Sequence, residues 1–281
     1  MSFQNNIFYK KVRDYSISKE IFELHHNPEY DLLITFPKPS PEKLPNYYES
    51  EEYISHTDGK RSLFERVYHL IKNSALKSKV KLINAQSKKG NLLDIGAGTG
   101  DFLVVAKRDG WQTTGIEPNI KAKTIAINKG VYFENNLADL ASHSFDIITM
   151  WHVLEHVANL DEYISELKRL IKPKGTILIA VPNYKSFDAN YYGKFWAAFD
   201  VPRHIWHFSQ TAIQKLFGEK NLKLVEVLPM KFDSFYVSLL SEKYKTGKMN
   251  FIKAFFVGLK SNQHAQRTKE YSSHIYVIKN Q

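Results

Sequence analysis

The stretch Asn91 to Leu103, NLLDIGAGTGDFL, constrains the fold of this chain more than any other feature. The apolar residues at its start predict a buried strand, and the apolar run from Phe102 predicts a helix. Between them, Gly96, Gly98 and Gly100 predict a tight turn in which the backbone passes close to something. A strand, a glycine turn and a helix start leave free N–H groups that face a ligand. The stretch therefore predicts a ligand cradle.

Strands and helices alternate around this turn. The pattern predicts strands over 91–95, 112–117, 131–134, 145–150 and 176–182, and helices over 100–109, 119–129 and 160–171. Such alternation indicates a parallel sheet wound by right-handed crossovers, with ligands beyond the carboxyl ends of the strands. Two later strands, over 222–229 and 273–279, would complete a seven-stranded α/β sheet with helices on both faces.

The segments that flank this core have other patterns. Residues 1–40 show no regular periodicity, whereas apolar residues at helical spacing predict a helix from Lys60 to Asn84. We therefore expect an N-terminal extension with a helical cap over 1–88 and a core over 89–281. Within the core, 232–262 predicts a helical insertion before the last strand. Its expected role is packing on the domain, with membrane-surface or partner binding as the alternative.

The composition excludes several kinds of chemistry and location. The chain has no cysteine, so disulfides, thiolate zinc sites and cysteine nucleophiles are excluded. The N-terminus lacks the apolar core of a signal peptide, and the longest apolar patch, 251–259, is too short to span a bilayer. We therefore expect a cytoplasmic protein. The net charge of +10 is spread along the chain, which favours a solvated basic surface over a nucleic-acid groove.

The residues around the glycine turn narrow the choice of ligand. The pattern G-x-G-x-G differs from the dinucleotide fingerprint G-x-G-x-x-G and is weak alone. Asp94 lies in the strand before the turn, and Glu117 closes the second strand, where a carboxylate can accept both ribose hydroxyls of a nucleoside. Residues 144–157, SFDIITMWHVLEHV, then end the fourth strand. These three context features strengthen the weak signal of the glycine pattern.

Over about 91–183 the chain resembles the class I S-adenosylmethionine-dependent methyltransferases, which have a Rossmann-like fold. LDIGAGTGDFL resembles the first motif of that family, GIEP the second, and FDIITMWHVLEHV with LKRLIKPKGTILIAVPN the run through the fourth and fifth strands. LEHV and DVPRHIWHFS resemble the branch that includes ubiquinone-biosynthesis O-methyltransferases and related small-molecule enzymes.

The resemblance implies that S-adenosyl-L-methionine is the cofactor and suggests its contacts. Asp94 would support the loop and the amino group, and Glu117 would hold the ribose. The turn itself would pass under the methionine part, with Gly96, Ala97, Gly98 and Gly100 as its contacts. Further candidates are Pro118 or Ile116 beside the adenine, Asn136 and Leu137 at the adenine edge, and Trp151 at the end of the fourth strand.

Methyl transfer to a phenol or catechol oxygen requires a base and the exclusion of water. His152, Glu155 and His156 would share one face of the helix expected after the fourth strand. The connection 184–208, which roofs the substrate in the family, carries Asp200, Arg203, His204 and His207. We expect the two segments to meet over the transferable methyl group.

Three interpretations of these histidines remain open. In the first, His152 or His204 is the general base, with His156 as a further catalytic candidate. In the second, the two segments form a divalent metal site from His152, Glu155, His156 and His204. In the third, His156 is buried and tied to the PRH loop by a hydrogen bond, and this is the interpretation that we favour for His156. We assign no metal ligand.

The predicted function is S-adenosylmethionine-dependent methyl transfer to a small molecule, through an oxygen nucleophile. The alternatives are an RNA or protein methyltransferase, suggested by the charge, and a cofactor-binding protein without catalysis. Nucleic-acid amino groups are poor candidates, because TMWH stands where their methyltransferases carry [DN]PP[YF]. We expect no transmembrane segment and leave peripheral membrane contact, the acceptor and the oligomeric state open.

Overall fold

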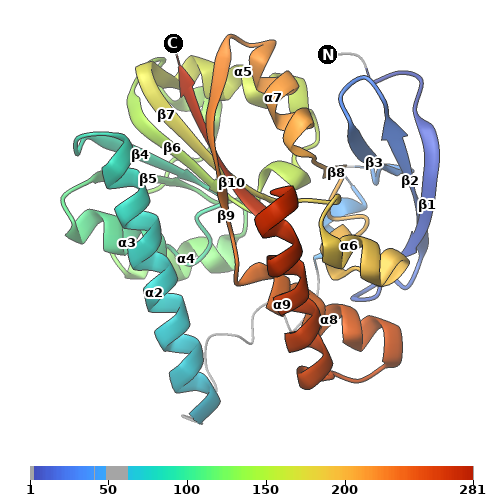
Figure 1. Cartoon of the computed structure of the whole chain (residues 1–281). Helices are drawn as coiled ribbons and strands as arrows, with labels where there is room; N and C mark the ends of the chain where they lie inside the picture. Colours follow the sequence, from blue (N-terminus) through green and yellow to red (C-terminus); the bar gives the residue numbers. More distant parts are fainter. Residues whose placement is uncertain (1–2, 41, 49–62, 281) are drawn as a thin grey trace.

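The computed structural model describes residues 3–40, 42–48 and 63–280, which form two sheets (Figure 1). The central sheet has six strands in the order β5-β4-β6-β7-β10-β9. These are β4 (Asn91–Ile95), β5 (Gln112–Ile116), β6 (Phe145–Trp151), β7 (Ile171–Pro182), β9 (Leu222–Pro229) and β10 (Ser273–Asn280). Strands β4 to β7 pair in parallel, and β10 runs antiparallel to both of its neighbours. The carboxyl ends of four strands therefore meet at one edge.

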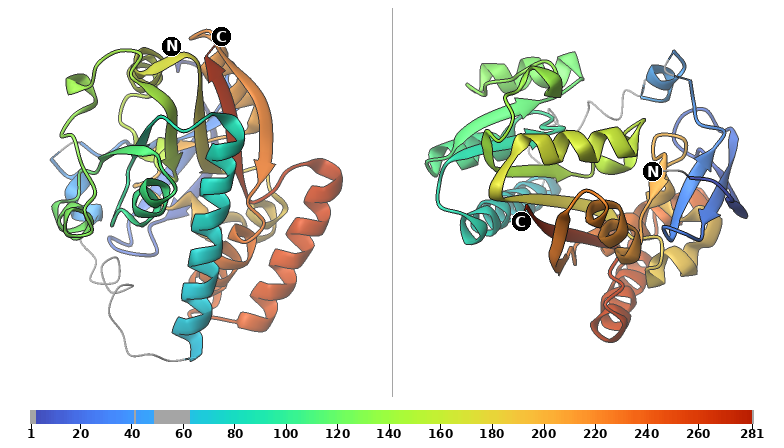
Figure 2. Two further views of the ribbon diagram at one scale, coloured as in Figure 1. Left: turned by 90° about the vertical axis from the view of Figure 1, so that its left-hand side faces the viewer. Right: turned by 90° about the horizontal axis from the view of Figure 1, so that it is seen from above.

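Helices cover both faces of this sheet, as predicted (Figure 2). The helices are α2 (Leu63–Gln86), α3 (Asp101–Arg108), α4 (Ile120–Asn128), α5 (Leu160–Leu170) and α7 (Gln210–Gly218). Because successive strand residues point to opposite faces, Leu92 packs towards α2, α3 and α4, whereas Leu93 packs towards α5 and α7. The sheet is thus the middle layer of three.

The predicted seventh strand, 131–134, does not form as an extended ladder. Backbone hydrogen bonds join only Gly115 to Tyr132 and Glu134, as an isolated parallel bridge opposite Phe133. Val131 is buried and Phe133 packs against the core beside Gly115, but Tyr132 is 58% exposed, so side-chain packing holds the segment without a continuous ladder. The described residues therefore give six strands in the central sheet where seven were expected.

Residues 3–40 are not irregular, contrary to the sequence prediction. They form β1 (Ile7–Arg13), β2 (Ile21–Asn27) and β3 (Leu32–Phe36), which lie beside the core in an antiparallel sheet (Figure 1). A short strand of the core, β8 (Trp206–His207), completes this sheet by pairing with β3. Buried Phe22 and Leu24 alternate with less buried neighbours. The extension is therefore joined to the core through β8.

The predicted helical segments are largely confirmed. Helix α2 covers the expected 60–84 region, although Lys60 to Ser62 lie outside the described residues. The insertion forms α8 (Asp233–Thr246) and α9 (Phe251–Thr268), which project below the sheet in Figure 1. The connection after β7 forms α6 (Phe187–Tyr192) and two short 3-10 turns, η4 (Gly193–Phe195) and η5 (Ala197–Phe199). None of the described helices is both long and apolar enough to cross a bilayer.

Candidate active site

The glycine turn after β4 has the geometry of a ligand cradle. Gly96, Gly98 and Gly100 all have positive φ, at 70°, 54° and 75°. A Cβ on Gly96 would lie 2.4 Å from Val153, and one on Gly100 would lie 2.7 Å from Ala126. A Cβ on Gly98 would meet no atom within 4 Å. Two glycines are therefore required by packing and φ, whereas Gly98 faces open space that a ligand can enter.

Asp94 lies directly beneath this turn and is 2% exposed. Its Oδ1 accepts a hydrogen bond from Thr149 Oγ1 at 2.6 Å, across the β4–β6 pair. Burial raises the pKa of Asp94 to about 7, although the Thr149 hydrogen bond and the charge of Lys79 act in the opposite direction. A buried carboxylate of this kind gains from a nearby cation. Asp94 therefore fits an ammonium group such as that of S-adenosylmethionine.

Glu117 follows β5 and is held by two backbone donors. Its Oε2 accepts from the Gly98 N–H at 2.7 Å, and its Oε1 accepts from the Asn119 N–H at 2.8 Å. Each carboxylate oxygen has a further lone pair, so the side chain can still accept two hydroxyl groups. With the open space at Gly98 and the buried carboxylate of Asp94, these residues fit S-adenosylmethionine.

The remaining cofactor candidates differ in their surroundings. The Trp151 ring packs edge-on against Phe102 and lies under the Lys79 ammonium, which is 4.1 Å from the ring centroid. Pro118 and Asn136 are exposed, and Leu137 packs partly buried against the core. Sequence reasoning missed Lys79, which α2 carries to this edge of the sheet.

The segment after β6 is a turn and not the predicted helix. The His152 N–H donates to Ala180 O at 2.9 Å, so the pairing of β6 with β7 continues to His152. His152 then adopts a left-handed conformation with φ of 58°, and the short 3-10 turn η3 (Leu154–His156) follows. Helix α5 begins only at Leu160. The expected shared helix face is therefore wrong, although the three polar residues stay close together.

His152 lies between two carboxylates. Its Nδ1 is 3.4 Å from Glu155 Oε1, and its Nε2 is 3.3 Å from Asp233 Oδ2 at the start of α8. Although burial opposes the charged form, Asp233 and Glu155 raise the pKa of His152 to about 10. The imidazole is therefore protonated near neutral pH and has no free lone pair with which to accept a proton.

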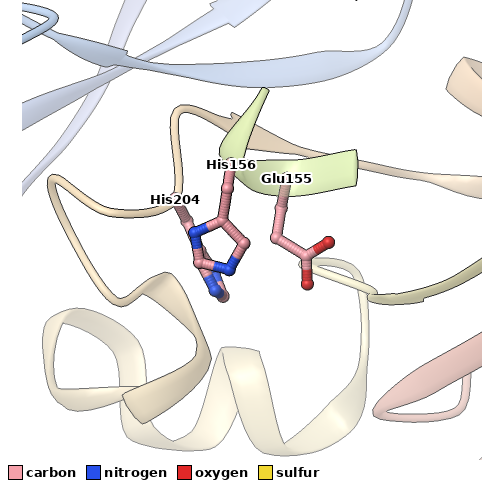
Figure 3. Close-up of side chains that lie close together, drawn as sticks. All are labelled: Glu155, His156 and His204. Atoms are coloured by element: carbon pink, nitrogen blue, oxygen red, sulfur yellow. The ribbon is translucent and has the colours of Figure 1, made fainter. Parts of the chain in front are cut away.

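Glu155, His156 and His204 point toward one another, the first two from η3 and the third from the connection after β7 (Figure 3). One ligand atom from each residue lies within 4.8 Å of the others. The Glu155 side chain is 1% exposed, and its carboxylate receives no hydrogen bond from the described residues. Although burial favours the neutral acid, His152 and His204 hold the pKa of Glu155 below its usual value. The Oε1 atom of Glu155 is thus ion-paired with His152 at 3.4 Å, whereas its Oε2 atom is buried and has no hydrogen-bond partner among the described residues.

Backbone carbonyls fix both imidazoles of this cluster. His156 Nδ1 lies 3.0 Å from Arg203 O, and His204 Nδ1 lies 2.9 Å from Ala198 O. A carbonyl can only accept, so each Nδ1 carries a hydrogen, and Nε2 is the atom through which the neutral form of each ring would accept. Burial, with the neighbouring His204, lowers the pKa of His156 to about 4. His156 is therefore neutral at neutral pH.

The two segments expected to meet do so, and the predicted link between His156 and the PRH loop is confirmed. A second link joins the Ile205 N–H to Glu155 O at 2.8 Å. Buried Arg203 anchors the loop by ion pairs with Asp200 and with Asp14 of the N-terminal sheet. Of the four ligands expected for a metal site, three lie together, while His152 is paired with Asp233 and Glu155.

Comparison with known proteins identifies the family. The profile of the methyltransferase-domain family matches residues 67–227. The ubiquinone biosynthesis O-methyltransferase of Rickettsia typhi is 26% identical over 201 residues, which cover 65% of this chain and 81% of that protein. The enzyme of the same name from Rhodopseudomonas palustris strain TIE-1 is 30% identical over 146 residues, covering 48% and 58%.

Solved structures share the fold at low sequence identity. Magnesium protoporphyrin IX methyltransferase from Synechocystis, solved with S-adenosylhomocysteine, superposes with a TM-score of 0.57 at 15% identity and covers 86% of this chain and 100% of that chain. An S-adenosylmethionine-dependent methyltransferase from Archaeoglobus fulgidus gives 0.52 at 16% identity, covering 74% and 93%. The chain belongs to the methyltransferase-domain family and is a class I S-adenosylmethionine-dependent methyltransferase.

Proposed function

We propose that the acceptor is a small molecule with an oxygen nucleophile, and that its hydroxyl group binds at Glu155, His156 and His204. The observation that carries this proposal is the buried Glu155 carboxylate, whose Oε1 atom is ion-paired with His152 and whose Oε2 atom has no hydrogen-bond partner among the described residues. A buried carboxylate oxygen without a donor is costly, and a substrate hydroxyl would supply that donor to Oε2. The matching relatives are O-methyltransferases by name, which supports an oxygen acceptor.

His204 is the stronger candidate for the general base. Its Nε2 is the atom that would take the proton, because Nδ1 is held by Ala198 O, and it lies 3.9 Å from Asp200 Oδ2, so the imidazolium formed would be next to a carboxylate. His152 is already protonated near neutral pH and therefore cannot take the proton. His156, which is neutral, can orient the hydroxyl through its Nε2.

The other half of the reaction is the binding of the cofactor by the residues of the glycine turn. When bound there, S-adenosylmethionine supplies an electrophilic methyl group to the acceptor. Asp94 would hold the ammonium, Glu117 would hold the ribose, and Gly96 to Gly100 would lie against the methionine part. Ala97, Pro118, Asn136, Leu137 and Trp151 complete the proposed set of contacts. The segment 184–208 would roof the acceptor and exclude water.

The experiment is to incubate the enzyme with methyl-labelled S-adenosylmethionine and a cell extract. Mass spectrometry of the products should find the label in a small molecule, and fragmentation should place it on oxygen. Label found only in RNA or protein, or only on nitrogen or carbon, would contradict the proposal. A matched reaction without enzyme identifies methylation caused by the extract itself.

We also propose a cytoplasmic enzyme whose α8–α9 pair touches an anionic membrane surface. Within 231–269 the exposed charges are all basic, because Asp233 and Glu242 are at least partly buried and paired. The same pair exposes large apolar side chains, namely Phe232, Tyr236, Met249, Phe251, Ile252, Phe255, Phe256 and Leu259. Exposed apolar residues among lysines favour the surface of anionic lipids.

Co-sedimentation with phosphatidylglycerol vesicles tests this surface. Binding should fall for Phe256→Asp and persist for Phe8→Asp, because Phe8 is similarly exposed but lies on the N-terminal sheet. Equal binding to phosphatidylcholine vesicles, or none to either, would contradict the proposal.

A further inference from the structure

The methionine part of S-adenosylmethionine carries two opposite charges, an ammonium and a carboxylate. Asp94 fits the ammonium, but a carboxylate brought into the same buried region needs a cation or several donors. The sequence motifs around the glycine turn offer Asp94 and Glu117, which are both acidic. A side-chain cation for the cofactor carboxylate must therefore come from a segment outside these motifs.

Lys79 is a cation at this edge of the sheet without a carboxylate in contact. Its ammonium lies 4.1 Å from the centroid of the Trp151 ring, and no hydrogen bond or ion pair is recorded for it among the described residues. Two other lysines around the cradle already have partners, since Lys129 pairs with Asp101 and Lys123 donates to Asn135. Unlike Lys129 and Lys123, Lys79 therefore has an ammonium group that is free, within the described part of the chain, to pair with a ligand carboxylate.

The surroundings of Lys79 favour the arrival of an anion. Burial lowers the pKa of Lys79, while the charges of Asp94 and Asp233 act in the opposite direction. An ammonium removed from water gains more from a direct carboxylate than an exposed one does. The indole Nε1 of Trp151 beneath it is also buried and has no hydrogen-bond partner among the described residues. The indole N–H is a donor only, so it too requires an oxygen.

We propose that Lys79 binds the carboxylate of the methionine part of the cofactor, with the Trp151 indole beside it. Asp94 would then bind the ammonium and Lys79 the carboxylate of the methionine part of the cofactor. Helix α2 becomes part of the cofactor site and not only a cap over the sheet. This inference deepens the proposed assignment of Asp94 and Gly96 to Gly100 to the methionine part and rests on it.

Calorimetry with two ligands isolates this contact. The first ligand is S-adenosylhomocysteine, and the second is S-adenosyl-3-thiopropylamine, which keeps the amine and lacks only the carboxylate. Lys79→Met should weaken binding of the first about tenfold or more, because a charged hydrogen bond is lost. It should leave binding of the second within about twofold, because that ligand has no carboxylate to lose. Lys79→Arg should retain most of the affinity for the first ligand.

The control variant is Lys81→Met, which removes an exposed lysine two residues away on the same helix. It should leave the affinity for both ligands unchanged, and circular dichroism should show that all variants are folded. An equal effect of Lys79→Met on the two ligands, or no effect on either, would overturn the proposal. If the unaltered protein binds neither ligand, the cofactor assignment fails first, and the role of Lys79 fails with it.

Discussion

The two halves of the candidate active site are built in different ways. The cofactor half takes Asp94, the glycine turn and Glu117 from one strand–helix–strand unit, within 24 residues of each other. The acceptor half joins η3 to the PRH loop, which Arg203 in turn ties to Asp14 of the N-terminal sheet. The residues of the first half are close together in the sequence, whereas the second half is formed by segments that are far apart in the sequence. A substitution in the acceptor half should therefore leave cofactor affinity unchanged, and a substitution in the cofactor half should leave the acceptor residues in place.

The largest expected effect comes from His204→Ala in the acceptor half. Loss of a general base lowers kcat by roughly 10²- to 10⁴-fold. The dissociation constant for S-adenosylhomocysteine should change by less than about twofold, because the cofactor half is untouched. Single-turnover transfer of labelled methyl and calorimetry measure the two quantities. Equal losses in both would show that the halves are not separate.

Glu117→Ala should have the next largest effect, in the cofactor half. Because hydrogen bonds to a charged group contribute roughly 1.5–3 kcal/mol each, the affinity for S-adenosylhomocysteine should fall at least about tenfold. Glu226→Ala, which removes an exposed carboxylate on β9, is the matched control. An unchanged dissociation constant in the folded variant would place the ribose elsewhere.

A pH dependence should appear in the cofactor half. The pKa of Asp94 is raised to about 7, so its carboxylate is mostly protonated at pH 6 and mostly ionised at pH 8. Only the ionised form attracts the cofactor ammonium, so affinity should rise by about tenfold over this interval. Asp94→Asn should remove the dependence. Affinity that falls with rising pH in calorimetric titrations would contradict the role of Asp94.

The raised pKa of Asp94 affects the pH dependence of folding stability in the opposite direction. A carboxyl group whose pKa is higher in the folded state binds more protons there, so its contribution to stability is lost as pH rises from about 4 to 7. As pH rises, the ionisation of Asp94 should therefore increase cofactor affinity and decrease the stability of the unliganded protein. Thermal unfolding of the unaltered protein and of Asp94→Asn across this range measures the difference.

The smallest effect is expected from metal removal in the acceptor half. If His204 is the base and Glu155 receives the substrate hydroxyl, treatment with EDTA should leave turnover within about twofold of the untreated enzyme. A large loss that Mg²⁺ or Zn²⁺ restores would instead assign Glu155, His156 and His204 as ligands of a divalent cation.

The sequence predicted the strands and the glycine turn that carry the proposed cofactor contacts, because these signals are local. The glycine spacing and Asp94 lie at a strand with a clear apolar run, Glu117 closes the next strand, and both strands formed within a residue of their expected bounds. Lys79, which we propose as a cofactor contact, was not a candidate from the sequence because α2 was interpreted as a cap. A signal was present, since Lys79 lies three residues after Leu76 and four before buried Ile83, on the buried face of the helix.

The acceptor half could not be predicted to the same depth. Helical spacing suggested one face for His152 and His156, but the left-handed His152 ends β6 in a turn instead. The N-terminal strands were missed because much of β1 is exposed and gives no apolar alternation, and because the sheet depends on the two residues of β8. The turn at His152 and the N-terminal sheet both depend on contacts between segments that are distant in sequence. A local sequence pattern does not predict such contacts.

A crystal structure with S-adenosylhomocysteine tests the arrangement of the two halves most directly. The account predicts the ribose at Glu117 and His204 within about 10 Å of the cofactor sulfur, a separation that an acceptor and a water can bridge. His152 should remain paired with Asp233, next to the same site. A sulfur more than about 10 Å from both histidines would separate the cofactor from the proposed base and contradict the account.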